Sequence, residues 1–190
     1  MLFRSTVISD NPMLNVRLND GIEHFQPQRI VMDSHLKLPL ESSIVKTANK
    51  IPVTVCCLKK LSKQEEEKKS LLKKQGIKII QAKADKAGHI NIEETLSILG
   101  QSGIDSILVE SGGKLASSFL FPPLAQKIQC YICPKIFGAS SFTPASILGA
   151  KKIEDAVELS KPSISLFEND VLLEYQIVGL AKNASSKEAK

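Results

Sequence analysis

Short apolar runs rich in Val and Ile recur along this chain, and polar or helix-forming stretches separate them. The runs lie at residues 29–32, 53–58, 77–81, 106–110, 127–133, 164–167 and 171–178. The interior runs are apolar at successive positions, so both faces of each strand are expected to be buried. Strands of that kind occur in largely parallel sheets that helices cover on both sides. The pattern therefore predicts an α/β fold.

Two helices with recognisable ends are predicted between these runs. Ser62 and Glu65 form a capping-box pair at the start of the first helix, and Gly76 stands where that helix should end. Asn91 can cap a second helix, which is expected to run to Leu99 and to end at the following glycine. Helices in these places would cover the predicted sheet.

The C-terminal part of the chain shows a different pattern. Residues 167–171 (FENDV) are typical of a tight turn between two strands, and no helix is predicted around them. An α/β region followed by antiparallel strands predicts a mixed sheet with an added C-terminal hairpin. Residues from 182 onward are small, polar and charged, and we expect them to fray.

The composition argues against nucleic acid and membranes as partners. The net charge is +5, and two solvated segments, residues 62–75 and 182–190, hold most of it. The chain has no Trp, two Tyr and seven Phe, whereas nucleic-acid surfaces place aromatic side chains among their cations. No apolar run approaches the roughly 20 residues that a bilayer requires. Residues 1–9 (MLFRSTVIS) do not have the pattern of a signal peptide.

The four cysteines are predicted to be reduced and structural. Cys56 and Cys57 lie inside one apolar run, whereas Cys130 and Cys133 form a C-x-x-C in a predicted strand. Residues three apart in a strand face opposite sides of the sheet, so the thiols of Cys130 and Cys133 are not expected to share an ion. No second C-x-x-C is present and the three histidines are scattered. We therefore expect no metal and a cytoplasmic protein.

The stretch from residue 103 to residue 120 (GIDSILVESGGKLASSFL) suggests ligand binding. An apolar run ends at Glu110, the glycines at 112 and 113 follow, and a helix is predicted from there to Leu120, where two prolines stop it. Glycines at such a junction let backbone N–H groups approach an anion, and the helix N-terminus adds about half a positive charge. A tight turn that binds nothing explains the same residues equally well.

A second stretch of interest covers residues 5–18 (STVISDNPMLNVRL). Asp10-Asn11-Pro12 is a turn signature, and Arg17 follows it. A guanidinium in this position can pair with a phosphate through two hydrogen bonds. On these residues alone, a turn with a surface arginine is the simpler interpretation.

Four motifs taken together resemble a known family. They are T-V-x-x-D-N-P-x-L-x-V-R, R-I-V-M-D-S-H-L-K-L-P, G-I-D-S-I-L-V-E-x-G-x-x-L-A-x-x-F-L and Y-I-x-P-K-I-F-G, in this order. The chain resembles the reductase domain of the bifunctional riboflavin-biosynthesis deaminase/reductase from about residue 4 to residue 179. The resemblance implies a dihydrofolate-reductase-like fold, a three-layer α/β/α arrangement with a mixed, mostly parallel sheet and a C-terminal antiparallel hairpin. Residues 1–181 would form one reductase domain, and residues 182–190 a flexible polar tail.

The resemblance also implies an activity, the NADPH-dependent reduction of 5-amino-6-(5-phosphoribosylamino)uracil to the ribitylamino compound. A hydride would reach the anomeric carbon of the ribose in its open-chain imine form. The protein then has to place cofactor and substrate against each other and exclude water. No catalytic acid or base is identified in the sequence, and the resemblance favours a homodimer.

The family's binding positions carry over wherever the motifs match. Those that contact the substrate are Leu14, Arg17 and Glu110, and Arg17 suits the 5′-phosphate. Those that contact NADPH are Thr6, Asp10, Ser34, Gly112, Gly113, Lys114, Leu115, Ala116, Ser117 and Ser118. Lys59 and Lys60 follow a predicted strand and are either contacts for the cofactor's 2′-phosphate or solvated loop lysines.

The sequence departs from the family in two places. Ser111 replaces the first glycine of the family's V-E-G-G, which would be strained if that position needed a positive φ. The family's domain opens with a strand that carries K-x-A-x-S-x-D-G, and this pattern is missing here, as are the H-x-E and P-C-x-x-C of the deaminase half. We therefore expect an N-terminally truncated domain. The alternatives are a non-catalytic remnant and a reductase of the related 2,5-diaminopyrimidine ribosyl phosphate.

Overall fold

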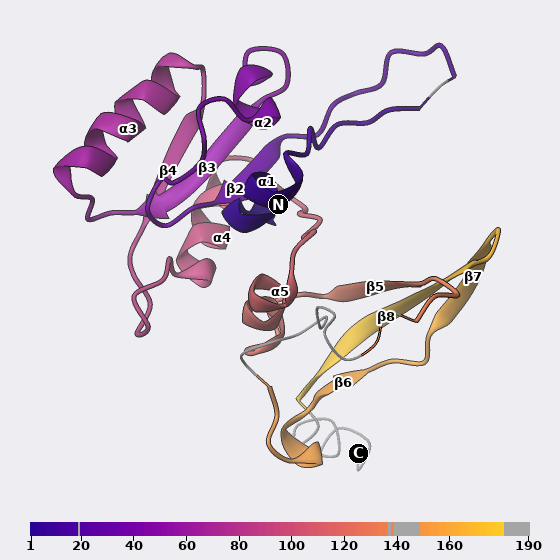
Figure 1. Cartoon of the computed structure of the whole chain (residues 1–190). Coiled ribbons are helices and arrows are strands. Elements are labelled where there is room, and N and C mark those ends of the chain that lie inside the picture. Colours follow the sequence, from indigo (N-terminus) through magenta and orange to yellow (C-terminus); the bar gives the residue numbers. More distant parts are fainter. Residues whose placement is uncertain (19, 137, 139–148, 181–190) are drawn as a thin grey trace. The chain divides into compact units, whose positions relative to one another are not determined.

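The chain divides into two compact units, Met1–Ser111 and Gly112–Lys190, and each contains its own sheet (Figure 1). The computed structural model describes residues 1–18, 20–136, 138 and 149–180. The predicted tail, residues 182–190, lies outside the described residues. That residues 1–181 act as one domain stays a prediction. The two units are described separately below.

The first unit is built on a four-stranded parallel sheet. Its strands are β1 (Leu2–Phe3), β2 (Arg29–Met32), β3 (Val53–Leu58) and β4 (Lys78–Ala82), in that order across the sheet. All three strand pairs are parallel, as the continuous apolar runs predict. Every residue of β2 and β3 is buried, which is why neither strand shows polar–apolar alternation.

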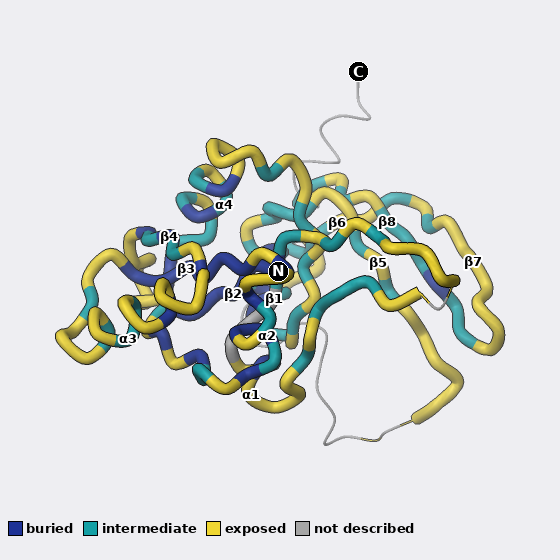
Figure 2. The backbone as a smooth tube through the Cα atoms, turned by 90° about the horizontal axis from the view of Figure 1, so that it is seen from above, coloured by how far each residue is buried: buried dark blue, intermediate teal, exposed yellow. Residues whose placement is uncertain are grey.

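Helices cover both faces of this sheet and give the predicted three layers. The helices α1 (Arg4–Asp10), α2 (Ser43–Lys46) and α3 (Lys63–Lys74) lie on one side of the sheet, and α4 (Ile92–Gln101) lies on the other side (Figure 2). Buried side chains from the first three helices, the sheet and the connecting loops form the main core, which comprises Val7, Val31, Leu36, Leu38, Ile44, Val45, Ala48, Val53, Val55, Cys57, Leu72 and Ile77. The α/β fold class is thereby confirmed.

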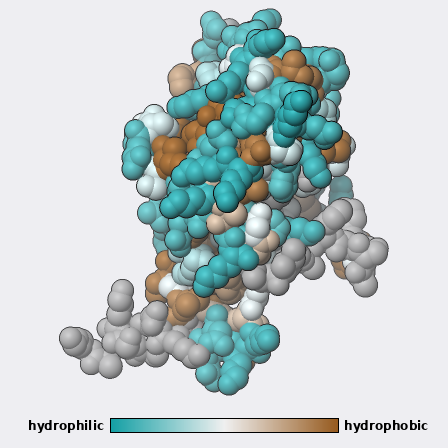
Figure 3. Space-filling model, turned by 90° about the vertical axis from the view of Figure 1, so that its left-hand side faces the viewer, coloured by the Kyte–Doolittle hydropathy of each residue, from teal (hydrophilic) through white to brown (hydrophobic). Residues whose placement is uncertain are grey.

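The helix ends follow the predicted capping signals. The Ser62 hydroxyl accepts a hydrogen bond from Glu65 N at 3.3 Å, and the Glu65 carboxylate accepts one from Ser62 N at 2.6 Å. Gly76 follows the last turn with a φ of +81°. The Asn91 side chain caps α4, but this helix extends to Gln101, two residues beyond its predicted last residue, Leu99. The α3 side of the molecule is largely hydrophilic (Figure 3).

The predicted strand at residues 106–110 does not form. Its hydrogen bonds to the start of β1 involve a single residue, because the Met1 amino group donates to Leu108 O at 2.6 Å and Glu110 N donates to Met1 O at 2.9 Å. A strand needs a ladder that continues over several residues. Leu108 is also 63% exposed, so the run is apolar without being buried.

The second unit pairs one helix with an antiparallel sheet. The helix α5 (Gly113–Leu120) precedes β5 (Lys127–Ile132), and the strands β6 (Val157–Leu159), β7 (Ser163–Phe167) and β8 (Asp170–Leu180) follow a short 3-10 helix at Ile153–Asp155. The long strand β8 pairs with each of the other three strands. The hairpin between β7 and β8 confirms the predicted turn. Among the described residues the parallel and antiparallel strands form two separate sheets rather than the single mixed sheet that was expected.

Candidate functional site

The carboxyl edge of the parallel sheet gathers several residues that the sequence singles out. The chain leaves β1 directly into α1, which carries Thr6, and leaves β2 at Ser34 and β3 at Lys59. Because these strands are parallel, their carboxyl ends lie at the same edge, where ligands bind in open α/β sheets. Hydrogen bonds hold this edge together, since Leu58 N donates to Ser34 O at 3.1 Å and Lys59 N donates to Ala82 O at 2.9 Å.

The V-x-D-S motif forms a tight turn after β2. Asp33 is buried, and its carboxylate accepts a hydrogen bond from Leu38 N at 2.7 Å. The Ser34 hydroxyl accepts one from Ile90 N at 3.4 Å and stays half-buried. The Asp33 side chain therefore stabilises the turn, whereas the Ser34 side chain remains partly accessible to a ligand. The sequence analysis missed this role of Asp33, although a carboxylate directly after a buried strand is a signal for it.

Two lysines follow β3 and differ in their surroundings. The Lys59 ammonium lies 2.7 Å from a carboxylate oxygen of Glu94, whose other oxygen accepts a hydrogen bond from Lys83 N at 2.6 Å. The hydrogen bonds from Lys59 and then from Lys83 N hold the pKa of Glu94 below its ordinary value. Within the described part of the chain, Lys60 makes no side-chain hydrogen bond or ion pair, so its charge is available to a ligand.

The D-N-P turn starts the loop that carries Leu14 and Arg17. Asp10 is the last residue of α1 and is exposed. Leu14 is half-buried against the main core with a φ of +49°. Arg17 is exposed, and none of the described side chains forms a hydrogen bond or ion pair with it. Its guanidinium therefore keeps all of its donors for a ligand.

The predicted site residues of the first unit do not bond to one another. Among the residues that the structure describes, no side-chain hydrogen bond or ion pair joins any two of them; they are Thr6, Asp10, Leu14, Arg17, Ser34 and Glu110. Glu110 is exposed and lies next to the start of β1 through its bond to Met1. The polar members of this set do not bond to one another and are therefore available for ligand binding, unlike the paired ions of α3.

The glycine-rich segment forms the N-terminus of α5. Gly112 is the N-cap residue and provides no side-chain cap for the first turn. The side chains of Leu115 and Ser117 are buried, and the Ser117 hydroxyl donates to Gly113 O at 2.7 Å. Contacts from this segment to a ligand would therefore come mainly from backbone N–H groups, from the exposed side chain of Lys114 and from the Ser118 hydroxyl, which donates to Lys114 O at 3.1 Å. Ser111 does not have a positive φ, so its replacement of a glycine causes no backbone strain.

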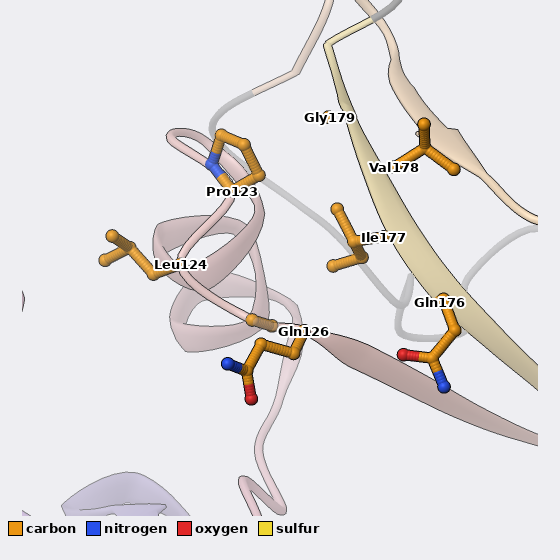
Figure 4. A pocket seen from close by; sticks show the side chains of 8 residues that line it. Pro123, Leu124, Gln126, Gln176, Ile177, Val178 and Gly179 are labelled. Carbon is orange, nitrogen blue, oxygen red and sulfur yellow. The ribbon is translucent and has the colours of Figure 1, made fainter. Parts of the chain in front are cut away.

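A pocket of about 530 Å³ lies in the second unit between the end of α5 and β8 (Figure 4). Its lining residues are Pro123, Leu124, Ala125, Gln126, Gln176, Ile177, Val178 and Gly179. None of them is ionisable and none is a predicted site residue. This pocket is therefore not the site that the sequence predicts.

The thiols and carboxylates show no metal site in the part of the chain that the structure describes. No group of three His, Cys, Asp or Glu side chains is placed to hold an ion. All four cysteines are free, and burial raises the pKa of the Cys56 and Cys57 thiols to about 12.

Comparison with known proteins identifies the family. The model of the RibD C-terminal domain matches residues 1–173. The chain belongs to this family. The riboflavin biosynthesis protein RibD of Actinobacillus pleuropneumoniae is 33% identical over 174 residues, which are 91% of this chain and 44% of that protein. The chain thus spans less than half the length of this relative.

Two further relatives agree with the assignment to the RibD C-terminal domain. The 5-amino-6-(5-phosphoribosylamino)uracil reductase of Buchnera aphidicola is 29% identical over 181 residues, and the match covers 89% of this chain and 81% of that protein. The solved structure of Acinetobacter baumannii RibD has a TM-score of 0.76 at 22% identity and covers 93% of this chain and 46% of that one. The structural likeness supports the expected dihydrofolate-reductase-like fold.

Proposed function

We propose that the chain catalyses the NADPH-dependent reduction of 5-amino-6-(5-phosphoribosylamino)uracil to 5-amino-6-(5-phosphoribitylamino)uracil in riboflavin biosynthesis, with residues 1–181 acting as one reductase domain. The observation that carries this proposal is the match to the Buchnera reductase, which extends over 81% of that protein and 89% of this chain. Because the match covers most of a protein that is named only as a reductase, the similarity concerns a reductase domain.

The exposed guanidinium of Arg17 favours a substrate that carries a phosphate. Its guanidinium is exposed and unpaired in the described structure, and a guanidinium pairs well with a phosphate through two hydrogen bonds. Leu14 and Glu110 would complete the substrate contacts, with Leu14 fixed against the core and Glu110 accepting hydrogen bonds from the substrate.

NADPH fits the remaining groups. The uncapped backbone N–H groups at the start of α5 can donate hydrogen bonds to a phosphate. Thr6 and Asp10 lie on α1, and Ser34 lies two residues after β2. Lys60 offers an unpaired positive charge after β3, which favours a cofactor with a 2′-phosphate. When bound, the cofactor supplies the hydride.

The main task of the protein in this reaction is to position the cofactor and the substrate. A hydride from the bound cofactor would go to the anomeric carbon of the open-chain imine, and the imine nitrogen would take up one proton to become the amine. Arg17 would hold the far end of the sugar, so that the reacting carbon is placed against the cofactor. No acid–base residue of this chain is assigned to the delivery of that proton.

The test is a kinetic assay of the purified chain. We expect millimolar NADPH to raise the melting temperature, and we expect the absorbance of NADPH at 340 nm to fall when the uracil substrate is added. If the chain reduced only the 2,5-diaminopyrimidine ribosyl phosphate, it would catalyse the reduction that precedes deamination. Absence of NADPH binding together with absence of turnover on either substrate would overturn the proposal in favour of a non-catalytic chain.

The antiparallel sheet supports a homodimer. Cross-strand register places one apolar set on a single face: Ile128, Cys130, Ile132, Ile164, Leu166, Val171, Leu173 and Tyr175. Ile164 is 66% exposed and Leu166 is 76% exposed. The opposite face is mixed, because it carries the Lys127–Glu174 ion pair beside the exposed rings of Tyr131 and Phe167. A second copy of the chain would cover this apolar face.

Sedimentation velocity tests the dimer. Leu166→Lys should shift the protein to monomers because it places a charge on the apolar face. Ser165→Lys changes the neighbouring residue on the opposite face and should leave the dimer intact. A monomeric parent protein would contradict the proposal.

A cytoplasmic location is consistent with the free thiols. Cys56 and Cys57 are buried without a disulfide, and the described Cys130 and Cys133 are also unpaired. Among the described residues, no helix is long and apolar enough to cross a bilayer. Cell fractionation with antibody detection would test this location.

A further inference from the structure

Arg29 is a buried cation without a carboxylate partner among the described residues. It starts β2 and is 2% exposed. Its Nη1 donates to Met13 O at 2.9 Å and to Thr47 Oγ1 at 2.8 Å, and its Nη2 donates to Thr47 O at 3.1 Å and Ile51 O at 2.5 Å. Burial lowers the pKa of this guanidinium. A buried charge balanced only by neutral oxygens is costly, and an apolar side chain would fill this place in the core at lower cost.

The contact with Met13 links this cation to the loop that carries Leu14 and Arg17. Two residues close to Met13 in the chain have left-handed backbones, Asn11 with a φ of +43° and Leu14 with a φ of +49°. For residues other than glycine this conformation is unfavourable, less so for asparagine, and it persists where the surroundings enforce it.

Asn11 supplies a second tether for the same loop. Its side-chain oxygen accepts a hydrogen bond from Ser43 N at 2.7 Å, at the first residue of α2. Asn11 itself is exposed, so this bond is made at the surface of the unit rather than in its core. The two tethers act on either side of Pro12.

A third attachment lies directly before Arg17. Val16 N donates to the Gln26 side-chain oxygen at 2.9 Å, and the Gln26 side-chain nitrogen donates to Val16 O at 3.2 Å. Residues 11–16 are thus attached at three points to other parts of the first unit. Arg17 follows the last of them with its side chain unpaired.

We propose that Arg29 and Asn11 are positioning residues for substrate binding, which hold residues 11–16 so that Leu14 and Arg17 are in place before the phosphorylated substrate arrives. The proposal rests on the proposed function, because it assigns the substrate to Leu14 and Arg17. If the loop is already ordered in the free protein, binding the substrate does not cost the conformational entropy of ordering it. The substrate therefore binds more tightly. The predicted NADPH contacts lie outside residues 11–16, so we expect this loop order to affect the substrate rather than the cofactor.

Asn11 offers the cleaner test, since its substitution leaves no cavity in the core. Asn11→Gly removes the side-chain tether while keeping the left-handed backbone accessible. We expect the KM for the uracil substrate to rise about tenfold, as for the loss of one good hydrogen bond, while kcat and the KM for NADPH stay within about twofold. Asn11→Asp keeps an oxygen that can accept from Ser43 N and should restore a KM close to that of the parent.

Two further variants separate positioning from general stability. Arg29→Lys keeps the charge but lacks the planar set of donors, so it should raise the same KM and leave the KM for NADPH unchanged. Glu41→Gln is the matched control, because Glu41 is exposed near α2 and pairs with Lys46. It should change neither KM.

A double variant decides whether Asn11 acts through Arg17. Arg17→Ala alone should raise the substrate KM, and adding Asn11→Gly to it should raise this KM by no more than about twofold, because the group being positioned is gone. An unchanged substrate KM in Asn11→Gly, or a full tenfold effect in the Arg17→Ala background, would overturn the positioning role while the parent enzyme remains active. An inactive parent would instead contradict the proposed function itself.

Discussion

Lys59 and Glu94 form an ion pair between the end of β3 and the first turn of α4, with 2.7 Å between the ammonium nitrogen and a carboxylate oxygen. The neighbouring Lys60 has no such partner among the described residues. The sequence presents the two lysines as equivalent candidates for a 2′-phosphate contact, and the ion pair distinguishes them. Lys59 is held at the surface of its own unit, whereas the charge of Lys60 remains available.

This difference predicts unequal effects on the cofactor. Lys60→Gln should raise the KM for NADPH about tenfold and leave the KM for NADH unchanged, because only NADPH carries the 2′-phosphate. Lys59→Gln is the matched control and should change the KM for NADPH by less than about threefold. Steady-state kinetics with both cofactors measures these values, and equal effects of the two substitutions would count against Lys60 as the selective residue.

The capping box of α3 predicts a local loss of stability. Ser62→Ala removes the hydroxyl that accepts from Glu65 N, and it should lower the free energy of unfolding by about 1 kcal/mol. Ser70→Ala is the control in the same helix, since the Ser70 hydroxyl donates to Glu66 O within the helix and its loss should cost little. Urea unfolding followed by circular dichroism measures both. A loss as large in Ser70→Ala as in Ser62→Ala would speak against the capping role.

The four thiols should differ in reactivity. Burial raises the pKa of Cys56 and Cys57 to about 12, so at pH 8 neither thiol is ionised or accessible. Cys133 is exposed, and although its hydrogen bond with Asp170 raises the pKa of its thiol, it should react with an aromatic disulfide reagent faster than the half-buried Cys130. Mass spectrometry of labelled peptides identifies the sites. Rapid labelling of Cys56 in the folded protein would show that the strand opens easily.

The same thiols predict a loss of stability at alkaline pH. In the unfolded chain Cys56 releases its proton near pH 9.0, whereas in the folded chain it holds that proton to about pH 12. The unfolded state is therefore favoured progressively as the pH rises above about 9. Cys56→Ala should make the free energy of unfolding fall less steeply between pH 9 and pH 10.5, as measured by urea titrations. An identical slope in the variant would show that other groups control the alkaline transition.

Local signals in the sequence predict some elements well and others poorly. The capping residues Ser62 and Asn91 are bonded as expected, because a cap involves residues only three apart. The helix α1 was missed, since its Thr6, Val7 and Ile8 are β-branched and favour strands. Val7 is 1% exposed, so burial against the sheet stabilises this helix against its local preference. Residues 106–110 show the converse error, because apolar composition alone does not determine which strand pairs with which.

In the candidate site, too, some residues were identified from the sequence and others were not. The motifs led to Arg17, Ser34 and the glycines at the start of α5 as binding positions, and these assignments stay predictions. Residues that hold the loops in place were missed, above all Arg29, whose partners are Met13, Thr47 and Ile51. Their bonds join residues distant in sequence, so no spacing rule reveals them. A cation at the start of an otherwise apolar run was the one available signal.

The central strand β3 should report on the folding of the first unit by itself. All six of its residues are buried, and it pairs with β2 on one side and β4 on the other. Its amide protons should therefore exchange with deuterium only when this unit unfolds as a whole. The antiparallel strand β7 is exposed at every residue and offers no comparable protection. Exchange rates in the two strands would thus give separate stabilities for two parts of one chain without cutting it.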